Sequence, residues 1–154
     1  MQGHWASFGI GFVAGLRSMT ASAALSWAAS LGRTRIRWIP AGPGPRRFAT
    51  AAALAEMAGD KMPFAPDRRI PPSFAARLAI GAVGGAALAG RDASPLSGAL
   101  IGMAGAVAGT LLGRAARGAT TRSGADWVRG LTEDTVAAGL ATALVCLAER
   151  RSQA

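Results

Sequence analysis

Residues 96–114 read LSGALIGMAGAVAGTLLGR and contain no ionisable side chain before Arg114. A helix of about 20 residues crosses the ~30 Å hydrocarbon core of a bilayer. The glycines of this segment recur every three or four residues, along one stripe of a helix: Gly98, Gly102, Gly105, Gly109 and Gly113. Glycine stripes let helix backbones approach closely in lipid, so the segment predicts a transmembrane helix with a packing seam.

The composition of the whole chain also indicates a membrane protein. Of its 154 residues, 51% are apolar and 16% are charged, whereas soluble domains carry about 25% charged residues. The mean hydropathy is +0.29. A chain of this length is enough for one domain, so we expect residues 1–154 to form a single transmembrane domain.

Three further segments are long and apolar enough to cross a bilayer: residues 5–31, 74–90 and 127–147. Residues 48–62 differ, because their apolar part is short and ends at Glu56. We therefore predict an all-α fold, a polytopic bundle of transmembrane helices. It has about four full spans and one short re-entrant or interfacial helix at 48–62.

The basic residues favour one orientation of this bundle. If residues 48–62 do not cross, thirteen basic residues face one side of the membrane and three face the other. If they do cross, each side receives eight. The positive-inside rule selects the uneven arrangement. It predicts both termini outside, a cytoplasmic Arg/Pro-rich loop at 32–47, and three outer basic residues, Arg91, Arg150 and Arg151.

The net charge of +9 raises the question of a charged partner. A nucleic-acid-binding domain would gather its arginines on one folded face, and here they lie between apolar segments, so we expect no nucleic-acid partner. Basic loops beside a bilayer instead predict contact with anionic lipid headgroups, here by Arg33, Arg35 and Arg37. The single histidine, His4, and the single cysteine, Cys146, lie far apart, so we expect no metal site and no cofactor.

Two more glycine pairs repeat the small-xxx-small pattern: Gly11 with Gly15, and Gly81 with Gly85. We predict that these residues form packing seams like that of the glycine stripe. The spacing leaves open whether the seams join helices of one chain or of two. Because so small a bundle has so many glycine faces, we expect a homo-oligomer in the bilayer, first of all an isologous dimer.

Six ionisable residues fall within or beside the predicted membrane segments: Arg17, Glu56, Asp60, Lys61, Glu133 and Asp134. Arg17 is in the middle of the first segment, where an unpaired charge is costly, so we expect a carboxylate of another helix as its partner. Glu56 and Asp60 are four residues apart and share one helix face. Together these side chains predict a polar centre that binds an ion or substrate, or an ionic lock that holds helices in register.

Two motifs resemble a known family. Residues 15–21, GLRSMTA, resemble the opening motif of domain of unknown function 4126, a family of small bacterial membrane proteins. Residues 55–63, AEMAGDKMP, resemble its Ala-Glu-x-x-x-Asp-Lys-x-Pro segment, and Pro-Pro-Ser, the glycine-rich segment and the Glu133–Asp134 pair follow in the same order. The resemblance covers residues 8–148 and implies a multi-pass protein of the bacterial inner membrane. It names no activity, cofactor or partner.

Translocation of a small solute or ion is the leading functional hypothesis. Glu56 and Asp60 would bind a cation or proton, with Arg17 as the counter-charge. The alternative is a structural or interaction protein that transports nothing, whose charges lock helices and whose arginine-rich loops bind anionic lipid or a partner. An intramembrane lipid-modifying enzyme would need an acid and a base, such as Asp60 and Lys61, but nothing in the sequence selects it, so we favour a role other than catalysis.

Overall fold

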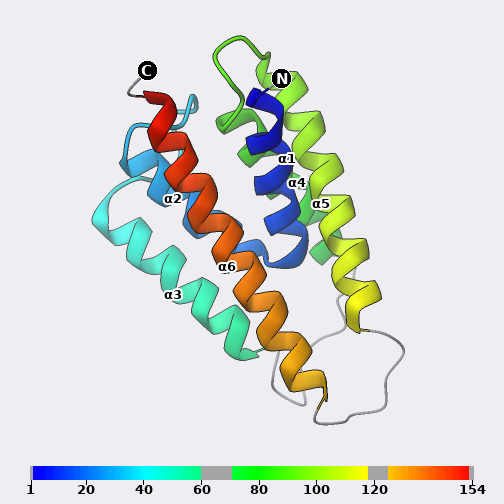
Figure 1. Cartoon of the computed structure of the whole chain (residues 1–154). Helices are drawn as coiled ribbons and strands as arrows, with labels where there is room; N and C mark the ends of the chain where they lie inside the picture. Colours follow the sequence, from blue (N-terminus) through cyan, green and yellow to red (C-terminus); the bar gives the residue numbers. More distant parts are fainter. Residues whose placement is uncertain (1, 60–70, 118–124, 153–154) are drawn as a thin grey trace.

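The computed structural model describes residues 2–59, 71–117 and 125–152 of the chain. The described residues form six helices, which run alternately up and down the bundle (Figure 1): α1 (Gln2–Leu16), α2 (Ser18–Ser30), α3 (Pro43–Gly59), α4 (Pro71–Ala87), α5 (Pro95–Arg117) and α6 (Ala125–Ser152). The predicted all-helical class is confirmed for these residues.

The predicted number of membrane spans is wrong. Among the described residues, two helices are long and apolar enough to cross a bilayer, Pro95–Ala115 within α5 and Gly130–Ala148 within α6. The span predicted at 5–31 is divided into α1 and α2, of 15 and 13 residues, and the span predicted at 74–90 falls largely in α4, of 17 residues. At ~1.5 Å of rise per residue, each of these three helices is shorter than the ~30 Å hydrocarbon core.

The first two helices form an antiparallel hairpin whose tip is Arg17. Near the start of α1, the Ser7 hydroxyl donates a hydrogen bond of 2.8 Å to the carbonyl of Gly85 in α4. Just after α2, the backbone N–H of Arg35 donates to the carbonyl of Ala87, at the same end of α4. The two open ends of the hairpin therefore lie together, and its tip points into the opposite part of the bundle (Figure 1).

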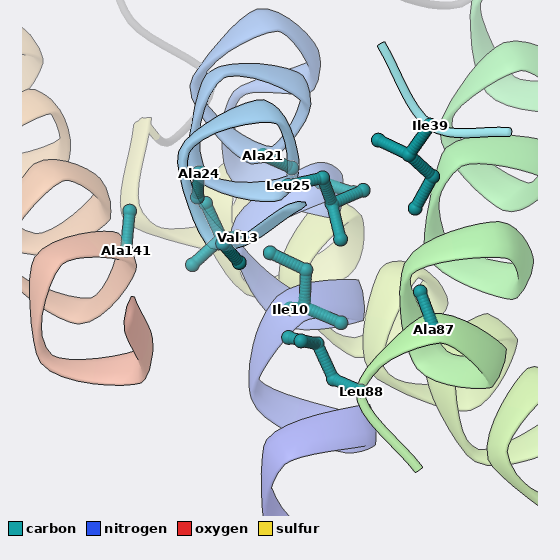
Figure 2. Packing of buried hydrophobic residues seen from close by; sticks show 11 residues of the cluster. Ile10, Val13, Ala21, Ala24, Leu25, Ile39, Ala87, Leu88 and Ala141 are labelled. Atoms are coloured by element: carbon teal, nitrogen blue, oxygen red, sulfur yellow. The ribbon is translucent and has the colours of Figure 1, made fainter. Parts of the chain in front are cut away.

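The apolar core lies between the two helices of this hairpin and their neighbours α4 and α6 (Figure 2). Ile10 of α1 and Leu25 of α2 lie close to each other, and a Cβ added to Gly84 of α4 would stand 3.0 to 3.2 Å from atoms of both. Ala141 of α6 belongs to the same cluster. Many members of the cluster are alanines, so the helices approach closely without large interlocking side chains.

Glycine forms the contacts between α1, α4 and α5. A Cβ added to Gly11 or Gly102 would stand less than 3.0 Å from the backbone of a facing helix. The same is true of the other glycines of these contacts: Gly15, Gly81, Gly85, Gly98, Gly105 and Gly109. Gly113 faces the side chains of Leu16 and Glu133 instead. These stripes therefore join helices of one chain, and an assembly of two chains would use other surfaces.

The outer faces of the two longest helices are apolar. On α5 the exposed large side chains opposite the glycine stripe are Leu96, Leu100, Met103 and Leu111. The exposed large apolar side chains of α6 are Val128, Leu131, Val136, Leu140 and Leu147. A surface helix of a soluble protein turns its large apolar residues inward and its polar residues outward. In α5 the small residues face inward and the large apolar residues face outward.

The arginines are not separated as the positive-inside rule predicts. Arg35 donates from Nη1 to the carbonyls of Gly90 at 2.8 Å and Ala93 at 2.6 Å. The loop that carries Arg91 therefore contacts the loop that carries Arg33 and Arg35, although the charge count puts these loops on opposite sides of a membrane. That prediction is wrong because the hairpin returns the chain to the end of the bundle at which it began.

Candidate functional site at the hairpin tip

A single residue, Arg17, separates α1 from α2 and leaves the helical conformation inside the bundle. Arg17 has φ −144° and ψ 105°, an extended conformation, between Leu16 at the end of α1 and Ser18 at the start of α2. A helix end leaves up to four backbone groups without partners in the helix. The break therefore creates carbonyls at the end of α1 and N–H groups at the start of α2 that need partners from elsewhere in the protein.

Glu56 of α3 supplies partners for the start of α2. Its Oε2 accepts a hydrogen bond from the backbone N–H of Met19 at 2.9 Å, and its Oε1 accepts one from Ser18 at 3.2 Å. The carboxylate also meets the positive end of the α2 helix dipole. Because the N-cap residue Arg17 makes no side-chain capping bond, the cap comes from another helix.

Arg77 of α4 has the opposite role at the end of α1. Its Nη1 donates to the carbonyls of Gly15 and Leu16, the second at 3.3 Å, and only 4% of the residue is exposed. The hydroxyl of Thr110 in α5 lies 3.3 Å from the same Gly15 carbonyl and 2.8 Å from the carbonyl of Ala106. A cation at the carbonyl end of a helix matches the helix dipole, so each end of the break faces a charge of the favourable sign.

Arg17 itself pairs with Asp134 of α6. The distance from Nη2 to Oδ1 is 2.5 Å, and the two side chains are only 1% and 9% exposed. Asp134 is thus the carboxylate of another helix that the position of Arg17 predicts. Removing one partner of so buried a pair leaves an uncompensated charge, which is strongly destabilising.

We call the set of Arg17, Glu56, Arg77 and Asp134 the hairpin-tip site. Its two cations and two carboxylates come from the break itself, α3, α4 and α6. The formal charges of the four side chains sum to zero.

The remaining predicted site residues are placed differently. Glu133 lies beside α5, with Oε1 3.6 Å from the position of a Cβ on Gly113. Asp60 and Lys61 fall outside the described residues. The predicted sharing of one helix face by Asp60 and Glu56, and the predicted place of Lys61 in the polar centre, therefore stay predictions.

Arg77 is a member of the site that was not among the candidate site residues predicted from the sequence. A signal was present, because Arg77 stands within an apolar helix that reads FAARLAIGAVGG from residue 74. A cation in such a segment needs an internal partner, by the same argument that applies to Arg17. What the sequence could not show is that the partners are backbone carbonyls rather than a carboxylate.

One further polar group lies next to the break. Thr20, in the first turn of α2, is 6% exposed, and its hydroxyl has no hydrogen-bond partner among the described residues. Threonine hydroxyls in helices usually bond to a carbonyl of the preceding turn. A buried hydroxyl without such a bond is a group that a water molecule or an ion would satisfy.

No protein-family model, curated protein or solved structure matches this chain. The resemblance to the family of domain of unknown function 4126 therefore stays a prediction, which rests on the motifs around Arg17 and Glu56.

Proposed function

We propose that the chain is a multi-pass protein of the bacterial cytoplasmic membrane. The support is the outward-facing leucine surface of α5 and α6 together with the glycine contacts inside the bundle. Exposed apolar residues that gather on one face mark an interface, and lipid is an environment in which such a face is stable. The short hairpin of α1 and α2 would enter the bilayer from one side, with its tip held by the longer helices.

We further propose that the protein translocates a small ion or solute through the hairpin-tip site. The observation that carries this proposal is the break at Arg17, whose two helix ends are held by Glu56 and Arg77. Transporters build substrate and ion sites from interrupted helices whose ends point into the site. Non-helical backbone at membrane depth is tolerated where it is buried in protein or lines a water-filled cavity.

Glu56 is the group that a proton or cation would occupy in this mechanism. Its carboxylate attaches α3 to the hairpin through the N–H groups of Ser18 and Met19. A bound proton or cation neutralises that charge and weakens its attraction for the positive end of α2. Occupancy is thereby linked to movement of α3 against the hairpin, while Arg17 stays fixed by Asp134 as the counter-charge.

Flux measurements in proteoliposomes test this function. Vesicles that contain a pH-sensitive dye would report proton entry under an imposed potential, and a sodium gradient provides the second probe. We expect flux through the wild type, loss of flux in Glu56→Gln, and retained flux in Asp92→Asn, which changes an exposed acid of the loop after α4. Flux that survives Glu56→Gln in a folded protein would reject the role of Glu56, and absence of both fluxes from the wild type would reject ion translocation.

A structural role is the second candidate, and the Arg17–Asp134 pair favours it. A 2.5 Å ion pair between buried side chains is well suited to hold α6 against the hairpin. In this case the site binds nothing, and the chain acts through its surfaces. Flux separates the two candidates, because a transport site carries an ion flux that Glu56→Gln abolishes, whereas a lock has no flux to lose.

A further inference from the structure

A cavity of about 720 Å³ lies between α1 and α6, at the open end of the hairpin. The loop residues 32–35 and 88–91 complete its lining. None of the four residues of the hairpin-tip site lines this cavity. Its volume falls in the ~300–1,000 Å³ range of small-molecule sites in proteins.

The walls of the cavity are apolar. Their large side chains are Trp5, Phe8, Phe12, Leu140, Leu144 and Leu147. The rings of Phe8 and Phe12 stack with centroids 6.3 Å apart. Trp5, Leu140 and Leu147 are also exposed on the outside of the bundle, so the walls continue into its outward apolar surface. An acyl chain could therefore enter sideways, from a surrounding bilayer.

Arginines lie at the end of the cavity that the two loops form. Arg33, Arg35 and Arg91 line it, and the one acidic residue of the adjoining loop, Asp92, does not. The backbone N–H of Arg35 donates to the carbonyl of Ala87, and its guanidinium donates to the carbonyls of the loop after α4, so the two loops are tied together. The cations are thus held at one end of an apolar cavity.

We propose that this cavity binds one anionic phospholipid of the membrane. An acyl chain would lie along the walls between α1 and α6, and the headgroup phosphate would contact the arginines, of which Arg35 and Arg91 are exposed to solvent. Basic residues attract anionic lipid, and apolar walls favour hydrocarbon. The proposal rests on the membrane location in the proposed function but does not depend on translocation.

Fluorescence quenching by brominated lipids tests the site, because Trp5 lines the cavity. The substitutions Trp27→Phe, Trp38→Phe and Trp127→Phe leave Trp5 as the only indole. The protein, in zwitterionic micelles, would be titrated with phosphatidylglycerol or phosphatidylcholine brominated in the acyl chain. We expect saturable quenching by phosphatidylglycerol at a half-saturating concentration at least about tenfold below that of phosphatidylcholine, as expected for two or more favourable arginine contacts.

Two variants connect the quenching to this cavity. Arg91→Gln should raise the half-saturating concentration of phosphatidylglycerol about fivefold, since one basic residue beside an anionic headgroup has about that effect. The matched control Arg47→Gln changes an exposed arginine outside the cavity and should leave it unchanged. Ala6→Phe places a large ring in the cavity and should remove saturable quenching, with an unchanged melting temperature showing that the protein is folded.

Equal half-saturation by the two phospholipids would overturn the inference, as would tighter binding of a brominated free fatty acid than of phosphatidylglycerol. Failure of the proposed function looks different. A chain that stays in solution without detergent would reject the membrane location and the lipid site together. A chain that requires detergent but binds the two phospholipids equally well rejects the lipid site alone. The proton flux of Glu56→Gln is a separate measurement, and its outcome affects neither the membrane location nor the lipid site.

Discussion

The guanidinium of Arg77 in α4 donates to the carbonyl of Gly15 in the last turn of α1. This bond satisfies a helix end that stops inside the protein, where a carbonyl without a partner would be costly. The helix that benefits is not the helix that supplies the side chain. Stability of the hairpin therefore depends on residues far from it in the sequence.

Replacing Arg77 by Gln should lower the free energy of unfolding by about 2–3 kcal/mol, because a charged hydrogen-bond donor to two buried carbonyls is lost. Unfolding by denaturant in mixed micelles measures this loss. Arg114→Gln removes an exposed arginine of α5 and should change the stability by less than about 0.5 kcal/mol. Equal effects of the two substitutions would show that Arg77 does not support the end of α1.

Substituting either member of the Arg17–Asp134 pair should lower the stability of the protein. Arg17→Gln and Asp134→Asn should each destabilise by about 3–5 kcal/mol, because each leaves the other charge buried and uncompensated. The double variant should lose clearly less than the sum of the two. Additive losses in this double-mutant cycle would mean that the two side chains do not interact in solution.

Removing the cap that Glu56 provides should loosen the first turn of α2. Glu56→Ala should destabilise the protein by about 1–2 kcal/mol, in the range of other helix caps, and Glu56→Gln by less, since an amide oxygen can still accept one bond. Hydrogen exchange gives the local measurement. The amides of Ser18 and Met19 should exchange faster in Glu56→Ala, and unchanged protection of both would contradict the capping role.

The glycine contacts should tolerate no side chain. Gly102→Ala places a methyl group against the backbone of Gly81 at less than 3.0 Å, so α4 and α5 must separate, and we expect a loss of about 1–3 kcal/mol. The matched control is Gly139→Ala in α6, where nothing lies within 4 Å of the added Cβ. That variant should be neutral or up to about 1 kcal/mol more stable, because alanine is the better helix former. Thermal melting of both variants, side by side, checks the contrast.

The sequence predicted the long helices better than the break. The apolar runs at 96–114 and 127–147 fall inside α5 and α6, because length and composition alone determine whether such a run can be one helix. The segment 5–31 reads as equally continuous, since no proline interrupts it. Its break at Arg17 is held by Glu56 and Arg77, which come from other helices. Contacts between residues so far apart in the sequence leave no pattern in the short stretch around Arg17.

The candidate site shows the same limit. The position of Arg17 in an apolar run predicted a carboxylate partner, but four acids of similar placement were available, and only the packing of α6 identifies Asp134. The pairing of Glu56 with backbone N–H groups was not predictable, because the free ends it caps do not exist until the helix breaks. The periodicity of the sequence predicted the glycine stripe, but only the structure identifies the helices that the glycines face.

The order of synthesis gives the Arg17–Asp134 pair a consequence for biogenesis. The ribosome completes Arg17 more than a hundred residues before Asp134, which is several seconds at usual rates of elongation. During that interval the hairpin has an arginine with no counter-ion from α6. Packing of the last helix against the hairpin therefore completes the assembly, and in the proposed membrane location a nascent chain truncated before Asp134 should be a substrate for membrane quality-control proteases even though the first five helices are present.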